Sequence, residues 1–226
     1  MSDKFTCLHS GKCCELITTQ INISFSDVIR ISKHTSMSFK ELFDKAIGLQ
    51  PFFDPENPDK FDAELGLGIP CFFRQKKRCI IYDARPLNCR IFPYYIISTC
   101  PESELKNVFD KRYECIFQTK LDSKTKRNYK EYADRIGKII MDENEIVDEA
   151  LQRLELNIPV LMKMETDRDD EEAMNSHIKK CKSLIKGRLT DEKMDLLISV
   201  MEKMMVSNKF TDLKKIKVLE DKYLKN

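Results

Sequence analysis

The chain has 226 residues, of which 42% are hydrophobic, so it can form a hydrophobic core without disulfide bonds. Its 39 basic and 37 acidic side chains leave a net charge of +2, which argues against nucleic acid or an anionic membrane as a partner. No apolar run is long enough for a signal peptide or a membrane span. We therefore expect a protein of the reducing cytoplasm.

The composition of the chain changes near residue 118. Residues 1–118 are rich in cysteine, aromatic residues and proline, whereas residues 119–226 are charged and helical in their hydrophobic period. We predict a mainly α fold with a small β component (α+β). The first range is predicted to be an irregular cysteine-cluster domain with a short hairpin, and the second a helical domain, or a helical extension packed on the first.

The first elements are predicted by alternation and by helix caps. Residues 17–24 (ITTQINIS) carry isoleucine at alternate positions, which indicates a short strand. Two capping-box patterns predict helix starts, namely Ser24 with Asp27 and Ser38 with Glu41. Gly48 lies where a glycine would end the second helical stretch.

A loop and a hairpin are predicted next. Residues 51–60 (PFFDPENPDK) are punctuated by proline and indicate a loop. Residues 64–73 (ELGLGIPCFF) and 78–83 (RCIIYD) are predicted to pair as a hairpin with residues 74–77 (RQKK) as its turn. Cysteines therefore lie at both ends of that turn.

The second half repeats apolar residues at offsets of three and four, which predicts helices. The four sets are Val147 with Ala150, Leu151 and Leu154; Met174 with Ile178, Cys181 and Ile185; Leu197 with Val200, Met201 and Met204; and Leu213 with Ile216, Leu219 and Tyr223. Methionines at this spacing are more often core than a partner-binding groove, and we assign them to the core. A protein partner is expected to bind through this helical half.

Six of the nine cysteines come at short spacings, three in each of two segments. The first segment holds Cys7, Cys13 and Cys14, and the second holds Cys71, Cys79 and Cys89. In a reducing compartment such spacing favours metal ligands over disulfides, although free cysteines also occur as small buried hydrophobes. We assign Cys100 and Cys181 to the small buried hydrophobes.

Basic residues lie among these cysteines. Four thiolates around a divalent zinc, or around an oxidised four-iron cluster, leave about two excess negative charges. Candidates to compensate that charge are Lys76, Lys77, Arg78, Arg85 and Arg90. We expect Arg85 and Arg90 beside the cofactor, while an ordinary solvated basic turn is the alternative interpretation.

The identity of the metal is left open between iron and zinc. Adjacent side chains tend to point apart, so the Cys13 and Cys14 pair is less natural on a single tetrahedral zinc. The pair and the surplus of cysteines over four favour an iron-sulfur cluster slightly, whereas one closed tetrahedral set would favour zinc.

The segments FTCLHSGKCC and CFFRQKKRCIIYDARPLNCRIFPYY resemble the YkgJ-type cysteine-cluster proteins, the CxxCxxCC family of zinc- or iron-chelating domains. The resemblance implies a ligand set of Cys7, Cys13, Cys14, Cys71, Cys79 and Cys89, with Cys115 as the final member. Where the family's first motif has its second cysteine, this chain has Ser10. A serine oxygen is a poor ligand for soft metals, so His9, water or no ligand would occupy that position.

Three functions are compatible with these residues. The first is an iron-sulfur or iron protein for electron transfer, metal handling or metalloprotein assembly. The second is a structural zinc-binding adaptor whose helical half binds a partner. The third, implied by the resemblance alone, is an iron-sulfur enzyme related to flagellin lysine-N-methylase. No S-adenosylmethionine loop or catalytic triad supports it, so catalytic residues are not identified and enzyme activity stays open.

Overall fold

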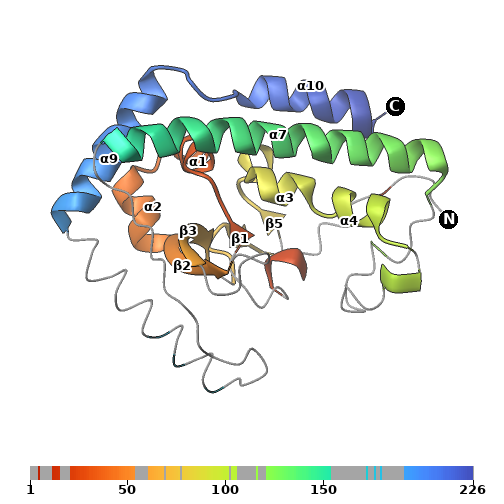
Figure 1. Cartoon of the computed structure of the whole chain (residues 1–226), viewed down its shortest axis with the longest axis horizontal. Helices are drawn as coiled ribbons and strands as arrows, with labels where there is room; N and C mark the ends of the chain where they lie inside the picture. The colour runs from red at the N-terminus through yellow and green to blue at the C-terminus, as the bar shows by residue number, and fades with distance from the viewer. Residues whose placement is uncertain are drawn as a thin grey trace.

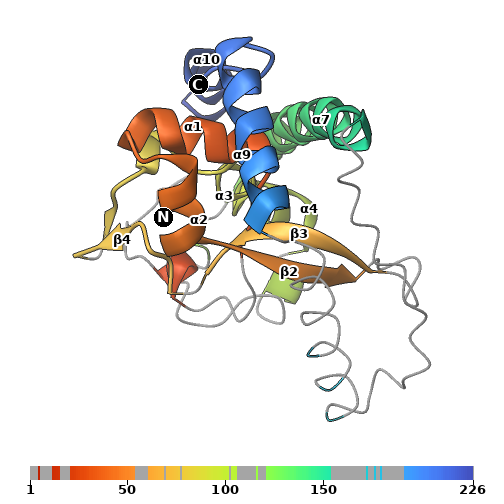
Figure 2. The ribbon, with the colours of Figure 1, turned by 90° about the vertical axis from the view of Figure 1, so that its left-hand side faces the viewer.

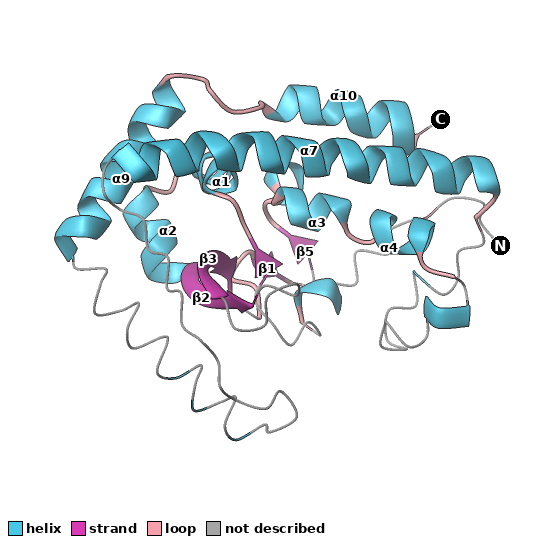
Figure 3. Ribbon diagram, in the orientation of Figure 1, coloured by secondary structure: helices cyan, strands magenta, loops and turns pink. Residues whose placement is uncertain are grey.

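One long helix, α7 (Ser123–Arg153), organises the fold in this computed structural model. It contacts α1 (Phe25–Thr35), α3 (Leu87–Ile91), α4 (Tyr94–Thr99) and α10 (Leu213–Leu224). Figures 1 and 3 show α10 along one side of α7 and α3 and α4 along the opposite side. The structure describes residues 5, 12–15, 21–53, 61–68, 70–76, 78–101, 103–105, 116, 121–153, 172, 176, 179 and 191–225.

A small antiparallel sheet lies beneath the helices. Its strands are β1 (Ile21–Asn22), β2 (Ile47–Phe53) and β3 (Phe61–Leu67), in the order β1-β3-β2. Figure 2 shows this sheet below α1, α2 (Phe39–Lys45) and α9 (Asp191–Val206). The mainly α fold with a small β component is therefore confirmed.

Both predicted helix starts are confirmed. The Ser24 hydroxyl accepts a 3.1 Å hydrogen bond from the Asp27 backbone N–H, and the Asp27 carboxylate accepts a 3.2 Å bond from the Ser24 N–H. Ser38 and Glu41 form the same reciprocal cap at the start of α2. The predicted end at Gly48 is wrong, because α2 ends at Lys45 and Gly48 pairs with β3 within β2.

The predicted hairpin is correct only around its turn. A two-residue ladder joins β4 (Arg74–Gln75) to β5 (Arg78–Cys79), and Lys76 adopts a positive φ of 46° between them. Residues 64–67 instead pair with β1 and β2 as part of β3, since that register buries Leu65 and Leu67. Residues 51–53 belong to β2 rather than to a loop, and residues 54–60 lie outside the described part.

The helices of the second half are confirmed where the structure describes them. Leu197, Met201 and Met204 are buried on α9, and Ile216 and Tyr223 are buried on α10. α7 begins within the polar stretch 121–130. It is much longer than the helix that the apolar residues at 147–154 predict. Most of the predicted helix around residues 174–185 lies outside the described residues, and residues 176 and 179, which are described, are helical.

One hydrophobic cluster combines both halves of the chain. Ile31, Leu42 and Phe73 from the first half share this cluster with Val147 and Met201 from the second. The division at residue 118 into two domains stays a prediction. No helix among the described residues is long and apolar enough to cross a membrane.

A buried charged network ties the helices together. Arg30 is 5% exposed, and its Nη1 donates to Asp27 at 3.0 Å while its Nη2 donates to Glu143 Oε2 at 2.6 Å. Its Nε donates to the Thr211 carbonyl at 3.0 Å, and the Thr211 N–H donates to Glu143 at 2.7 Å. Asp27 also accepts a 3.1 Å bond from the Leu87 N–H. The network therefore joins α1, α3, α7 and the segment before α10.

We predict that Glu143→Ala lowers the free energy of unfolding by about 3–5 kcal/mol, because it leaves the buried Arg30 charge without one of its carboxylates. Urea denaturation followed by circular dichroism measures the change. The control is Asp44→Ala, which breaks the exposed 3.7 Å pair with Lys40 and should change stability little. Equal effects of the two substitutions would contradict the prediction.

Candidate metal centre

The adjacent Cys13 and Cys14 side chains face one another. Both lie in the short 3-10 helix Lys12–Cys14, and their Sγ atoms are 3.9 Å apart. Two sulfurs on one tetrahedral zinc, with Zn–S bonds of about 2.3 Å, are about 3.8 Å apart. Adjacency in the sequence therefore does not keep these two thiols from sharing a metal ion, contrary to the expectation that neighbouring side chains point apart.

Cys71 joins this pair. Its backbone N–H donates a 3.3 Å hydrogen bond to the Cys14 carbonyl, and its thiol hydrogen bonds with the Cys14 thiol. The hydrogen bond with Cys14 lowers the pKa of Cys13 to about 7 and, in the same way, the pKa of Cys71 to about 7. The pKa of Cys14 is raised by its bonds with both neighbours and by burial. Cys14 is therefore the member of the three that keeps its proton, and its neighbours Cys13 and Cys71 ionise more readily.

Cys79 and Cys89 complete the described part of the predicted set. Burial raises the pKa of Cys79, which lies on β5, and the negative charge of Cys71 raises it further. Burial also raises the pKa of Cys89, with smaller contributions from the charges of Cys13, Cys71 and Asp27. The structure therefore brings all five of these thiols within electrostatic reach of one another.

The remaining predicted ligands, Cys7 and Cys115, lie outside the described residues, as do His9 and Ser10. Phe5 and Ile116 are the described residues nearest to those two cysteines in the sequence. Both pack in the hydrophobic cluster that also contains Cys13, and the Phe5 N–H donates a 2.9 Å bond to the Tyr129 hydroxyl. The ligand set as a whole stays a prediction.

The described thiols do not form a finished coordination site. Within the described ranges, no group of three or more Cys, His, Asp or Glu side chains is arranged so that it could hold a metal ion. A site at Cys13, Cys14 and Cys71 therefore needs further ligands or a local adjustment of the thiols. Cys100 caps the end of α4, where its thiol contacts the Pro101 carbonyl at 3.6 Å, and it packs against the same hydrophobic cluster as Cys13.

The two arginines predicted beside the cofactor have different surroundings. Arg85 lies 4.2 Å over the Tyr82 ring and its charge helps to lower the pKa of Cys13. Arg90 donates from Nε to the Arg85 carbonyl, from Nη1 to Glu220 at 2.6 Å and from Nη2 to the Asp83 carbonyl. Both roles stay predictions, but Arg90 has a protein acceptor for each guanidinium nitrogen.

Sequence reasoning missed Glu220, the carboxylate shared by these arginines. It lies on α10, is 7% exposed and accepts from Arg85 at 3.2 Å. Burial lowers the pKa of the Arg85 guanidinium, but the charges of Tyr82 and Glu220 raise it, and the pKa is raised overall. The available signal was that Glu220 lies on the same helix face as the buried Ile216 and Tyr223.

Arg74 was also missed. It lies opposite Cys79 in the β4–β5 ladder, and its backbone N–H donates a 3.0 Å bond to the Cys71 carbonyl. Its side chain pairs with Glu15, and its charge helps to lower the pKa of Cys13. The sequence places Arg74 in the exposed turn 74–77, whereas the structure leaves Gln75 and Lys76 of that turn exposed and Arg74 half-buried.

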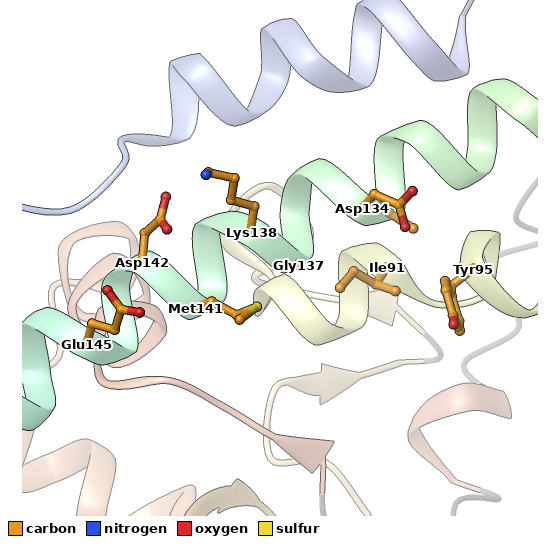
Figure 4. A pocket seen from close by; sticks show the side chains of 9 residues that line it. Ile91, Tyr95, Asp134, Gly137, Lys138, Met141, Asp142 and Glu145 are labelled. Atoms are coloured by element: carbon orange, nitrogen blue, oxygen red, sulfur yellow. The ribbon is translucent and has the colours of Figure 1, made fainter.

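A separate groove lies between α7 and the α3–α4 segment. It has a volume of about 600 Å³, and Figure 4 shows its lining side chains. They are Ile91, Tyr95, Ala133, Asp134, Gly137, Lys138, Met141, Asp142 and Glu145. The lining contains no cysteine or histidine, so it offers none of the ligands that soft metals prefer.

Comparison with protein families agrees with the thiol chemistry. The CxxCxxCC family model, described as a putative zinc- or iron-chelating domain, matches residues 6–188. The match covers more than half of the chain, and the protein belongs to this family. No curated protein and no solved structure matches the chain. Clustered thiols with lowered pKa values fit zinc or iron, because the thiolate is the form that binds these metals.

We predict that Cys14→Ala raises the pKa of Cys13 from about 7 toward its ordinary value of 9.0, since the hydrogen bond with Cys14 is the main cause of the lowering. At pH 7 the thiolate fraction of Cys13 should fall from about half to a few per cent. The pH dependence of iodoacetamide alkylation at Cys13, followed by mass spectrometry on metal-free protein, measures this. Cys100→Ala is the control and should leave the profile unchanged; an unchanged profile in Cys14→Ala would contradict the assignment.

Proposed function

We propose that this protein holds an iron-sulfur cluster, or iron, in the cytoplasm for electron transfer, metal handling or assembly of another metalloprotein. The proposed ligands are drawn from Cys7, Cys13, Cys14, Cys71, Cys79, Cys89 and Cys115. The observation that carries the proposal is the contact of three thiols, Cys13, Cys14 and Cys71, together with two more thiols, Cys79 and Cys89, whose pKa values are raised in part by the charges of Cys13 and Cys71.

The number of thiols favours an iron-sulfur cluster over a single zinc ion. A structural zinc takes four ligands, and five described thiols already exceed that number before Cys7 and Cys115 are counted. A structural zinc adaptor is the second candidate, because the 3.9 Å separation of the Cys13 and Cys14 sulfurs also suits tetrahedral zinc.

The thiols also determine how metal uptake depends on pH. Ligation needs thiolates, while the pKa values of Cys14, Cys79 and Cys89 are raised above the ordinary thiol value. These protons must leave when the metal binds, so affinity should fall as the pH falls. When bound, the metal or cluster supplies the redox or structural chemistry, and the chain supplies thiolates and a wall that excludes water.

The test is anaerobic purification with measurement of iron, acid-labile sulfide, zinc and the visible absorption spectrum. We expect a coloured protein that contains iron and sulfide. Cys13→Ala or Cys71→Ala should lower the metal content several-fold, because each removes a member of the contacting trio, whereas Cys100→Ala should retain it. Colourless wild-type protein with stoichiometric zinc would select the zinc adaptor, and protein that takes up neither metal would overturn both functions.

We further propose that the groove on α7 binds a protein partner through a helix that carries Lys or Arg beside apolar side chains. Met141 and Tyr95 are 66% and 47% exposed, so the groove offers apolar surface to a partner. Asp142 and Glu145 outnumber Lys138 in the lining and would complement a basic helix, while Asp134 is paired with Lys130 at 2.7 Å. A side chain added at Gly137 meets nothing within 4 Å, which leaves the groove open to close approach.

This proposal predicts that Gly137→Leu weakens binding of a synthetic amphipathic helix of leucine and lysine by about tenfold or more, because the new side chain fills the groove. Fluorescence anisotropy of the labelled peptide measures the affinity. Gly68→Leu is the matched control, since an added side chain there also meets nothing within 4 Å. Equal affinity for a peptide with glutamate in place of lysine would overturn the proposed charge complementarity.

A further inference from the structure

We propose that Arg74 and Arg85 form the anion-binding side of the metal site, with each Nε–H donating a hydrogen bond to a sulfur atom of the loaded centre. The inference rests on the proposed function and adds two residues that act on the ligands rather than on the metal. The class of acceptor is a negatively charged sulfur, either a cysteine thiolate or the inorganic sulfide of a cluster.

The first observation is a shortage of acceptors. The Nε atoms of Arg74 and Arg85 are buried and have no hydrogen-bond partner among the described residues. A buried donor without an acceptor costs about 1–3 kcal/mol. Such donors are rare in folded proteins, and two of them beside one group of thiols point to an acceptor that arrives with the metal.

The second observation is that each guanidinium is already fixed at its other end. Nη1 of Arg74 binds Glu15, and Nη2 of Arg85 binds Glu220 at 3.2 Å. The Tyr82 ring lies against the second guanidinium at 4.2 Å. Both side chains are therefore held in place while the buried Nε–H has no acceptor, which reduces the entropy lost when a further hydrogen bond forms.

The third observation places both charges at the same thiol. Arg74 lies across the ladder from Cys79, and its backbone N–H is bound to the Cys71 carbonyl. Arg85 and Arg74 both lie close enough to Cys13 for their charges to interact with its thiol. A loaded thiolate site would carry about two excess negative charges beside these two cations.

Other basic residues near the thiols do not meet these conditions. Arg90 has a protein acceptor for every guanidinium nitrogen, so it holds the Tyr82–Arg85 segment against α10 rather than contacting the sulfurs. Arg78 and Lys76 are exposed. We therefore assign Arg74, in place of Arg90, as the companion of Arg85.

Arg74→Gln and Arg85→Gln should each weaken Zn²⁺ binding by about 10–100-fold, the usual effect of removing a group that hydrogen bonds a metal ligand. Competition with a chromophoric chelator measures the affinity. The matched control is Arg78→Gln on the same hairpin, which should stay within about twofold of wild type because that guanidinium is exposed.

A spectroscopic measurement separates hydrogen bonding to sulfur from a general loss of structure. In the Co²⁺-substituted protein, the sulfur-to-cobalt charge-transfer band should shift in both variants, because hydrogen bonds change the electronic state of the ligating sulfur. Arg74→Lys should restore part of the affinity, since it keeps the charge, but should not restore the band, since lysine lacks an N–H at that position. If Arg85→Gln does not fold, the affinities and spectra of Arg74→Gln and Arg74→Lys test the proposal.

The outcomes for this inference and for the proposed function are distinct. Wild-type protein that binds neither zinc nor iron would overturn the proposed function and this inference with it. Wild-type protein that binds metal, with Arg74→Gln and Arg85→Gln both matching Arg78→Gln in affinity and spectrum, would overturn the arginine pair alone.

Discussion

The burial of Arg30 is the constraint on which the arrangement of the thiols depends. A charge that is 5% exposed is tolerable only with ionic partners, and these come from Asp27 on its own helix and Glu143 on α7. Asp27 also receives the N–H of Leu87, two residues before Cys89. The interaction that satisfies Arg30 therefore also sets where the Cys89 helix begins. A thiol group assembled from segments far apart in the sequence needs such a fixed frame, because loose thiols lose entropy on binding metal.

A second buried carboxylate, Glu220, fixes the same stretch of chain from the other side. It accepts from Arg85 and Arg90, while Asn88 between them donates a 2.8 Å bond to the Asn22 carbonyl next to the sheet. The segment from Tyr82 to Ile91 is thus held by α1, by α10 and by β1. The helical half of the chain consequently contributes to the metal centre without providing any of its described thiols. Its Glu220 pairs with Arg85 and Arg90 and so holds in place the segment that carries Cys89.

The parts of the structure that sequence predicted are those set by local chemistry. The caps at Ser24 and Ser38 and the apolar faces of α9 and α10 follow from neighbours within four residues. Strand pairing depends on residues far apart in the sequence. Residues 64–67 pair with β2, which buries Leu65 and Leu67, and so they do not extend the hairpin as the sequence predicted. Spacing likewise identified the cysteines but not Glu220 or Arg74, because their roles depend on which distant segments meet.

The two kinds of thiol in this group also explain why positive charge beside them favours metal binding. Cys13 and Cys71 have pKa values near 7, so at neutral pH they already carry much of the negative charge that a metal needs. Burial keeps Cys89 protonated, and each further thiolate raises its pKa again. Deprotonating the last thiols therefore requires the most free energy. Nearby cations lower that free energy because they offset the accumulating negative charge. The charges of Arg85 and Arg74 are among the causes that lower the pKa of Cys13, and they offset part of the negative charge that gathers there.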